Sequence, residues 1–317
     1  MKKIWLIGAG GMAQDYIKVL QGLDEDFIVI GRGEDTAKKC QETTGCQVQT
    51  GGLSEYLSTN PEKCSHAIIA VGVEKLYETT KQLLEYGINN ILVEKPGALY
   101  GWQFEELNNL VKKQNSNVFI AYNRRFYASV LKAQEIIKND GGVTSFNFEF
   151  TEWAHEIETL TKGEGVMENW FLSNSTHVVD LAFYLGGQPK EICSFVNGSL
   201  GWHPSGSNFS GAGNSDRNAL FSYQANWESA GRWGIEILTK EHRLIFRPME
   251  KLQIQNRGSI AVNYDEEIDY LLDTQYKPGL FLQTKAFLKN TFKGMCTIAE
   301  QYTMFVIYSK MVNYLEK

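Results

Sequence analysis

The chain has 317 residues, of which 43% are hydrophobic and 21% are charged, a composition typical of globular proteins with a full hydrophobic core. Its formal net charge is −6 and no block of lysines and arginines stands out, so we expect neither a nucleic-acid partner nor a membrane partner. At about 100–200 residues per domain, the length allows one large domain or two of ordinary size.

The N-terminal segment "MKKIWLIGAGGMAQDY" has a basic start and a short apolar run that Asp15 ends, so we expect no signal peptide. No stretch approaches the roughly 18 apolar residues that a transmembrane helix needs. The five cysteines are odd in number and form no C-x-x-C pair, which predicts reduced structural thiols and no metal site. Together these features predict a cytoplasmic protein.

The first 121 residues alternate short β-rich runs with amphipathic helical stretches. The expected strands are 3–7, 27–31, 46–50, 66–71, 90–94 and 117–122, and a helix is expected over 74–87, where a glycine closes it. Strands that alternate with helices predict βαβ units and a doubly wound parallel sheet of the Rossmann type. We therefore predict a dinucleotide-binding domain over residues 1–121.

After Tyr122 most of the expected strands follow one another directly. Helices are expected over 126–139 and 175–185 and again from Pro278, and strands over 143–153, 191–197, 218–228, 231–240, 241–248 and 251–256. Period-two alternation and hairpin spacing predict an open, mostly antiparallel sheet with helices on one face. The predicted fold class is thus α/β plus α+β, with a substrate-binding and oligomerisation domain over 122–317.

Two further expectations concern this second part. The segment 199–217 is rich in glycine, serine and asparagine, and we expect it to be a mobile loop, acting either as a lid or as a plain linker. The segments "FSYQANWES" and "RWGIEIL" are expected to place large aromatic and aliphatic side chains on the open face of the sheet. Self-association through that face, as a homodimer or homotetramer, would then cover them.

A glycine turn follows the first expected strand. Gly8, Gly10 and Ala13 fit the pattern G-x-G-x-x-G/A, and Gly11 and Met12 complete the turn. The first glycine permits the tight turn, and the second lets the backbone approach a pyrophosphate at the helix N-terminus. The alanine keeps the helix close to the strand. The pattern predicts a dinucleotide site; the alternative is a tight turn that binds no ligand.

The end of the second strand bears on the choice between NADP and NAD. An acidic residue is needed there to hold the ribose 2′-hydroxyl of NAD, but this chain has Gly31-Arg32-Gly33. A guanidinium can bind a 2′-phosphate, so Arg32 favours NADP. Glu34 and Asp35 leave NAD open.

Glu94, Lys95 and Pro96 follow the fifth expected strand. Ligands of doubly wound sheets bind beyond the carboxyl ends of the strands, so Lys95 is expected at the nicotinamide end of the cofactor. There its ammonium group can donate a hydrogen bond to the oxygen that is oxidised or reduced. Pro96 would fix the peptide that orients the lysine, with a cis bond as one option. An ordinary ion pair at the end of a strand is the alternative.

Four motifs together resemble the glucose–fructose oxidoreductase/inositol dehydrogenase (Gfo/Idh/MocA) family over essentially the whole chain. They are the glycine turn, "EKP" after the fifth strand, "YNRRF" at 122–126, and H-x-x-D in "THVVDLAFYLGG". The resemblance implies an NAD(P)-dependent oxidoreductase that transfers a hydride between nicotinamide and a sugar, a nucleotide sugar or a related polyol. It also implies dimers or tetramers.

The resemblance assigns roles to particular residues. Lys95 matches the active-site lysine of the family, and His177 matches the histidine that binds the reacting hydroxyl and can act as a general base. Glu94 and Pro96 match the residues that shape the turn, and Asn123 and Arg124 match positions that line the cofactor and substrate pocket. The remaining candidates for contact with the substrate are Tyr122, Ser173 and Trp153. Asp180 is interpreted as a structural or orienting residue.

One position departs from the family pattern. Many members read D-x-x-x-H, but here the carboxylate position holds Ser173, which cannot accept a proton as a carboxylate does. Either His177 and Lys95 carry the proton transfer alone, or another acid such as Glu168 takes over, or the reaction is not a plain alcohol oxidation. Two different functions also stay open: a redox-neutral enzyme that uses a tightly bound nicotinamide, and a non-catalytic NADP-binding regulatory protein.

Overall fold

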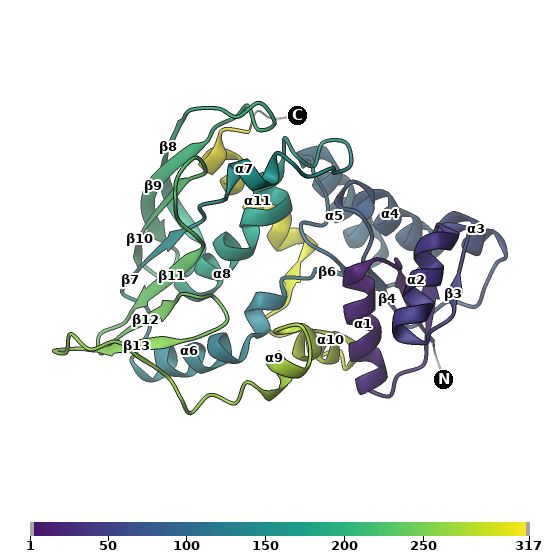
Figure 1. Ribbon diagram of the computed structural model, residues 1–317, viewed down its shortest axis with the longest axis horizontal. Coiled ribbons are helices and arrows are strands. Elements are labelled where there is room, and N and C mark those ends of the chain that lie inside the picture. The colour runs from purple at the N-terminus through teal and green to yellow at the C-terminus, as the bar shows by residue number, and fades with distance from the viewer. Residues whose placement is uncertain (1–2, 315–317) are drawn as a thin grey trace. The chain divides into compact units, whose positions relative to one another are not determined.

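The computed structural model describes residues 3–314, and the chain divides into two compact units (Figure 1). Of the described residues, the first unit comprises 3–123 together with Leu272–Met304. The second comprises Arg124–Leu271 together with 305–314. Each unit is built around one β-sheet.

The sheet of the first unit has the strand order β15-β6-β5-β4-β1-β2-β3. All neighbouring strands pair in parallel except β15, which pairs with β6 in the antiparallel direction. Side chains of β1 and β4 are all buried, as expected for a parallel sheet with both faces covered. The strands are β1 (Ile4–Ile7), β2 (Phe27–Ile30), β3 (Val48–Gln49), β4 (His66–Ile69), β5 (Asn90–Val93), β6 (Asn117–Ile120) and β15 (Cys296–Thr297).

Helices connect these strands, and the Rossmann prediction for this part of the chain is confirmed. The expected helix over 74–87 is present as α4, and Gly87 ends it in the left-handed conformation that favours glycine. The helices in the N-terminal part of the chain are α1 (Gly11–Gly22), α2 (Glu34–Thr44), α3 (Gly52–Ser58), η1 (Val73–Lys75), α4 (Leu76–Tyr86), α5 (Gly101–Gln114) and η2 (Asn123–Phe126). Those near the end of the chain are α9 (Leu271–Gln275), α10 (Leu280–Leu288) and α11 (Ile298–Val312).

The sheet of the second unit has the strand order β14-β13-β12-β11-β7-β10-β9-β8. Its neighbours are antiparallel except for the parallel pair β7–β10, so the predicted mostly antiparallel sheet is confirmed. The strands are β7 (Ser145–Glu149), β8 (Pro189–Asn197), β9 (Asn208–Ser215), β10 (Leu220–Asn226), β11 (Gly234–Leu238), β12 (His242–Phe246), β13 (Gln253–Asn256) and β14 (Asn263–Tyr264). The helices are α6 (Ala128–Asn139), α7 (Ala154–Ile157), η3 (Phe171–Ser175) and α8 (Thr176–Gly186).

Strand β9 corrects the prediction of a loop over 199–217. Residues 208–215 form an interior strand that pairs with β8 on one side and β10 on the other. Its small residues have a packing reason: a Cβ at Gly211 would lie 2.4 Å from the Tyr223 ring, and one at Gly213 would lie 2.5 Å from the Phe221 ring. The glycines therefore make room for large aromatic side chains on the next strand.

The face of the sheet on which the aromatic residues lie also differs from the prediction. Phe221 and Tyr223 of β10 are buried, and Phe221 packs edge-to-face against Phe183 of α8 at 5.2 Å. The alternate positions of β10, among them Ser222 and Gln224, are the exposed ones. The expectation that this segment places its aromatic residues on the open face is therefore wrong, because the alternation was assigned to the wrong face.

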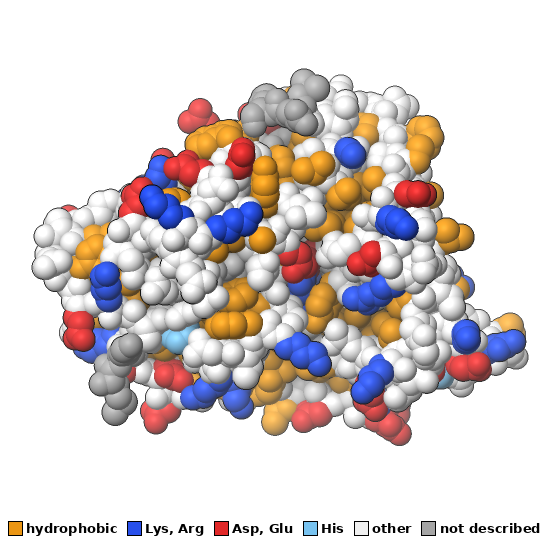
Figure 2. Space-filling view, turned by 180° about the vertical axis from the view of Figure 1, so that it is seen from behind, with side chains coloured by type: hydrophobic (Ala, Val, Ile, Leu, Met, Phe, Trp, Pro, Cys, Tyr) orange, Lys and Arg blue, Asp and Glu red, His pale blue; other side chains and the backbone are white. Residues whose placement is uncertain are grey.

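The surface carries charges of both signs. On the face shown in Figure 2, blue basic and red acidic side chains are interspersed, which agrees with the small net charge of −6. Among residues 3–314, no helix is long and apolar enough to cross a membrane.

Candidate functional site

A cleft of about 680 Å³ opens in the first unit, at the carboxyl ends of β1, β2 and β4. Its lining includes residues 7–12 of the glycine turn, residues 30–33 at the end of β2, and residues 51–54 and 70–72. Five predicted cofactor residues line it together: Gly8, Gly10, Gly11, Met12 and Arg32. The carboxyl edge of the sheet is where a doubly wound fold binds its ligands.

The geometry of the glycine turn fits a dinucleotide. Gly8 has φ +125°, and a Cβ there would lie 2.2 Å from the Ala70 carbonyl oxygen, so only glycine is accommodated. A Cβ at Gly10 or Gly11 would meet no atom within 4 Å, so the backbone faces open space. Gly10 is the N-cap of α1 and no side chain caps this helix, which leaves backbone N–H groups available to an anion.

This geometry predicts that Gly10→Val separates folding from cofactor binding. The backbone of Gly10 (φ −77°, ψ −175°) suits a β-branched residue, and the added atoms meet no part of the protein. We expect a melting temperature close to that of the native protein and at least a 10-fold loss of NAD(P)H affinity, measured by fluorescence titration. Gly201→Val, also placed in open space, is the control. Unchanged affinity in the Gly10 variant would contradict a pyrophosphate at this turn.

Arg32 lies at the end of β2, on the rim of the same cleft. Its carbonyl oxygen accepts a hydrogen bond from the Gly51 N–H at 3.2 Å, which fixes the backbone at this position. The side chain is exposed, and no described residue forms an ion pair with it. Glu34 and Asp35 lie in the first turn of α2, close in sequence. The guanidinium is thus available to a ligand.

The turn after β5 is held in place by hydrogen bonds from two helices. The Lys95–Pro96 peptide bond is cis. The Tyr16 hydroxyl of α1 donates to the Glu94 carboxylate at 2.9 Å, and the Gln301 side-chain amide of α11 donates to the Pro96 carbonyl at 3.2 Å. Burial raises the pKa of the Glu94 carboxyl, while the Tyr16 hydrogen bond and the charge of Lys95 act in the opposite direction.

Sequence patterns did not indicate Tyr16 or Gln301, since neither belongs to a motif. Each lies on a helix and forms its hydrogen bond with a residue far away in the sequence: Tyr16 with Glu94, and Gln301 with Pro96. Their contacts place the backbone of Lys95 between two hydrogen-bonded neighbours, at the carboxyl edge of the sheet. A lysine in such a turn can donate a hydrogen bond to a substrate oxygen.

Tyr122 and Asn123, at the end of β6, are buried. The Asn123 side-chain amide donates to the Pro278 carbonyl at 2.9 Å, so this residue connects the strand end to the segment before α10. In that segment the Lys277 ammonium lies 3.5 Å from the Asp15 carboxylate of α1. The cofactor role of Asn123 and the substrate role of Tyr122 stay predictions.

His177 lies in the first turn of α8 in the second unit, half-buried, with its ring centre 6.1 Å from that of Trp233. Ser173, one turn earlier, donates from its hydroxyl to the Asn169 carbonyl at 3.0 Å, so the hydroxyl is directed back at its own helix. Glu168 is exposed. The structure therefore gives Ser173 a local structural contact in place of the family's carboxylate.

A buried carboxylate that no motif indicated lies near this helix. The Glu152 side chain is 1% exposed and accepts hydrogen bonds from the Ser175 hydroxyl at 2.7 Å and from the Asn174 amide at 2.9 Å. Both donors lie directly before α8. Glu152 thus fixes the entry into the helix that carries His177.

Two arginines and two tryptophans, here called the arginine–tryptophan cluster, lie beside Glu152 and His177. The guanidinium carbons of Arg124 and Arg232 lie 5.1 and 4.8 Å from the centre of the Trp233 ring. Arg232 also lies 4.9 Å from the centre of the Trp153 ring. Of these four residues, the sequence motifs indicated only Arg124 and Trp153.

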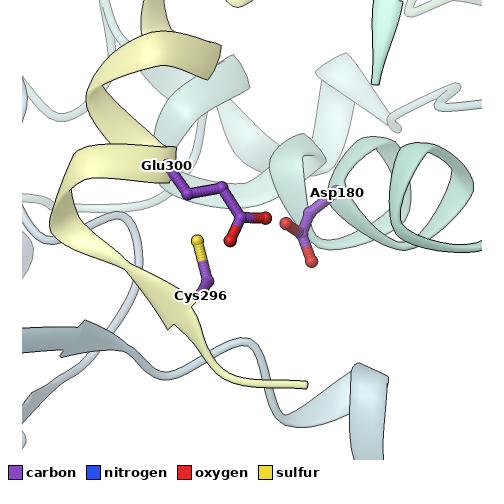
Figure 3. A group of neighbouring side chains, drawn as sticks. All are labelled: Asp180, Cys296 and Glu300. Carbon is purple, nitrogen blue, oxygen red and sulfur yellow. The ribbon is translucent and has the colours of Figure 1, made fainter. Parts of the chain in front are cut away.

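Asp180, which Figure 3 shows on α8, is a structural residue. Arg125 donates to both of its carboxylate oxygens, at 2.8 and 2.5 Å, and both side chains are 3% exposed. Figure 3 also shows Cys296 on β15 and Glu300 in the first turn of α11. None of the five cysteines, all within residues 3–314, forms a disulfide bond in the structure.

Three solved structures show how closely this fold is shared. A dehydrogenase (MviM) from Clostridium difficile is 20% identical, with 99% of each chain covered and a TM-score of 0.77. Levoglucosan dehydrogenase in complex with NADH and levoglucosan is 18% identical, with 98% of this chain and 96% of that chain covered and a TM-score of 0.78. UDP-N-acetylglucosamine 3-dehydrogenase GnnA from Acidithiobacillus ferrooxidans is 11% identical, with 99% and 98% covered and a TM-score of 0.75. Identities this low show the fold alone.

The sequence itself matches a family over its first part. No curated protein matches the chain. Residues 2–122, however, match the family described as "Oxidoreductase family, NAD-binding Rossmann fold" (GFO_IDH_MocA). This segment includes the glycine turn, Arg32, the turn after β5 and Tyr122. The resemblance drawn from the motifs is thereby confirmed, and residues 2–122 are similar to the NAD-binding Rossmann domain of Gfo/Idh/MocA oxidoreductases.

Proposed function

We propose that the protein is an NAD(P)-dependent dehydrogenase or reductase that acts on a CH–OH group of a sugar, a nucleotide sugar or a related polyol. The main support is that two turns lie at the same edge of one sheet. They are the open glycine turn after β1 and the turn with Lys95 after β5, which hydrogen bonds hold in place. In this proposal, residues 122–317 contribute the substrate-binding and oligomerisation part.

Lys95 and His177 are the proposed catalytic residues. A bound nicotinamide supplies a carbon that accepts or donates a hydride. The ammonium group of Lys95 donates a hydrogen bond to the substrate oxygen and stabilises its negative charge as the C–O bond order changes. His177 takes up the hydroxyl proton during oxidation and returns it during reduction, since an imidazole titrates near neutral pH.

The substrate class rests on similar proteins. Levoglucosan dehydrogenase and UDP-N-acetylglucosamine 3-dehydrogenase share the fold over nearly the whole chain, and by their names they act on a sugar derivative and on a nucleotide sugar. Trp153, Ser173 and Tyr122 remain the substrate neighbours that we propose from the sequence. Cytoplasmic location and assembly through the open sheet face belong to the same proposal; exposed Phe195 and Leu220 on that face support the assembly.

We propose NADP as the preferred cofactor because of Arg32. Its guanidinium lies on the cleft rim at the end of β2, where the fold holds the adenosine ribose. A 2′-phosphate bound by a guanidinium gains a charge-assisted hydrogen bond, whereas the hydroxyl of NAD does not. Glu34 and Asp35 keep NAD as the alternative.

The prediction for Arg32→Gln follows from this contact. Charge-assisted hydrogen bonds contribute about 1.5–3 kcal/mol, so NADPH affinity should fall about 10-fold or more, and NADH affinity by less than about 3-fold. Fluorescence titration with both cofactors measures the two values. Arg257→Gln, an exposed arginine of the second unit, is the control. If both affinities fall equally, Arg32 does not recognise the 2′-phosphate.

A thermal-shift screen with NADPH, NADH and a panel of sugars and sugar nucleotides, followed by absorbance at 340 nm, tests the function itself. We expect stabilisation by a nicotinamide cofactor and turnover of at least one polyhydroxylated compound. Cofactor that co-purifies and a reaction without net absorbance change would indicate a redox-neutral enzyme. Cofactor binding without any turnover would indicate a regulatory protein.

A further inference from the structure

The arginine–tryptophan cluster holds two cations on one aromatic ring. Arg124 and Arg232 both lie within 5.1 Å of the Trp233 ring centre, so their guanidinium carbons are at most about 10 Å apart. An aromatic face attracts each cation, but the two cations repel each other. Such an arrangement has positive charge in excess of what the ring can balance.

Arg124 has no acidic partner in residues 3–314. No ion pair forms with its guanidinium, and its buried Nε has no hydrogen-bond acceptor there. Burial lowers the pKa of Arg124, and electrostatic interactions with Tyr127, Glu250 and Glu152 act in the opposite direction. The guanidinium nevertheless keeps its charge at neutral pH, since arginine is not deprotonated in proteins.

Glu152 balances only part of this charge. Its carboxylate lies 3.7 Å from Arg232, and the same oxygens accept hydrogen bonds from Ser175 and Asn174. The Arg232 side chain remains 51% exposed, so its other N–H groups can reach a ligand. Among the described residues, Glu152 forms an ion pair with Arg232, whereas the charge of Arg124 is offset by Glu250 and Glu152 without a direct ion pair.

Trp233 supplies a second buried donor without an acceptor in the described chain. The residue is 6% exposed, and its indole Nε1 is buried with no hydrogen-bond partner in the described chain. A buried donor without an acceptor costs about 1–3 kcal/mol, so an acceptor from outside the chain would stabilise this site. Trp153, in contrast, donates from its own indole to the Gly231 carbonyl at 2.8 Å.

We propose that Arg124 and Arg232, together with the indole of Trp233, bind an oxyanion of the substrate, either a carboxylate or a phosphate. The inference rests on the proposed function and narrows its substrate class to acidic sugar derivatives. A guanidinium presents a planar set of N–H donors that matches the oxygens of both groups. An oxyanion that receives donors from both guanidinium groups would lie between them, and their carbons are at most about 10 Å apart. His177 lies next to the Trp233 ring, so a substrate held by its oxyanion would have a neighbouring hydroxyl group close to His177.

Isothermal titration calorimetry with D-glucuronate, D-glucose 6-phosphate and D-glucose tests the proposal, with and without NADPH. We expect one of the two charged probes to bind at least 10-fold more tightly than glucose; which of them does so distinguishes a carboxylate site from a phosphate site. Arg124→Gln and Arg232→Gln should each remove that preference. Arg243→Gln changes an exposed arginine that pairs with Glu236 on the same sheet and should retain it.

Arg124→Lys separates recognition from folding, because it keeps a charge but lacks the planar donors. It should retain the native melting temperature and lose most of the preference. Equal binding of glucose and both charged probes, or a preference that survives Arg124→Gln, would overturn the proposal. Turnover of neutral sugars by the Arg124→Gln variant at the native rate would leave the proposed function intact and remove this inference. Binding of a charged probe that depends on the arginines, without any oxidation or reduction of the probe, would support this inference and contradict the proposed function.

Discussion

Replacement of Lys95 by alanine is expected to lower kcat by about 10²–10³-fold, while the affinity for the nicotinamide cofactor changes less than about 3-fold. The loss corresponds to one preorganised donor directed at a developing oxyanion. Cofactor affinity should persist because the cleft at the glycine turn is lined by other residues. Steady-state kinetics with a competent substrate and a titration of NADPH fluorescence measure the two quantities.

Lys39→Ala, at an exposed position of α2, provides the matched control and should leave kcat unchanged. Lys95→Arg keeps the charge, and partial recovery of kcat with it would separate electrostatic stabilisation from exact placement. A Lys95→Ala enzyme with native kcat would exclude this residue from the chemistry. A variant that loses cofactor and substrate binding equally would show that the lysine maintains the turn.

Asp180→Ala is expected to lower the free energy of unfolding by about 3–5 kcal/mol. The change removes the carboxylate that holds the guanidinium of Arg125, 3% exposed, at 2.8 and 2.5 Å, and loss of one member of a buried ion pair is strongly destabilising. Urea denaturation followed by circular dichroism measures the effect. If the two units unfold in separate transitions, only the transition of the second unit should shift.

Glu236→Gln provides the contrast, because it removes a more exposed ion pair with Arg243 in the same unit. Exposed pairs contribute about 0–1 kcal/mol, so the transition should hardly move. Equal losses in the two variants would mean that burial does not determine the strength of the Arg125–Asp180 pair. Asp180→Asn, which keeps the shape but removes the charge, should fall between native protein and the alanine variant.

The first unit could be predicted well because its signals are local. Short β-rich runs, a glycine turn and helix-ending glycines such as Gly87 fix each element from neighbouring residues. Strand β9 had no such signal: Gly211 and Gly213 have low β propensity and occur there because Tyr223 and Phe221 need the space. That requirement comes from the tertiary structure.

The site was predicted in part for the same reason. Lys95 and the glycine turn belong to motifs with fixed spacing, so the sequence indicated them. Glu152 lies about 25 residues before His177, and the adjacent Arg232 and Trp233 lie about 55 residues after it, so no short spacing rule joins them. The alternation of β10 gave the period of its buried residues but not which face they occupy, since a shift of one residue exchanges the two faces.

Helix α1 connects two functions of the Rossmann unit through one rigid element. Its first residues provide the backbone N–H groups at the glycine turn, and about one and a half turns later Tyr16 holds Glu94, the neighbour of Lys95. A displacement of this helix would therefore move the glycine turn and the lysine turn at the same time. Loops elsewhere in the chain can vary without affecting this helix, whereas a change in the register of the helix would displace both turns.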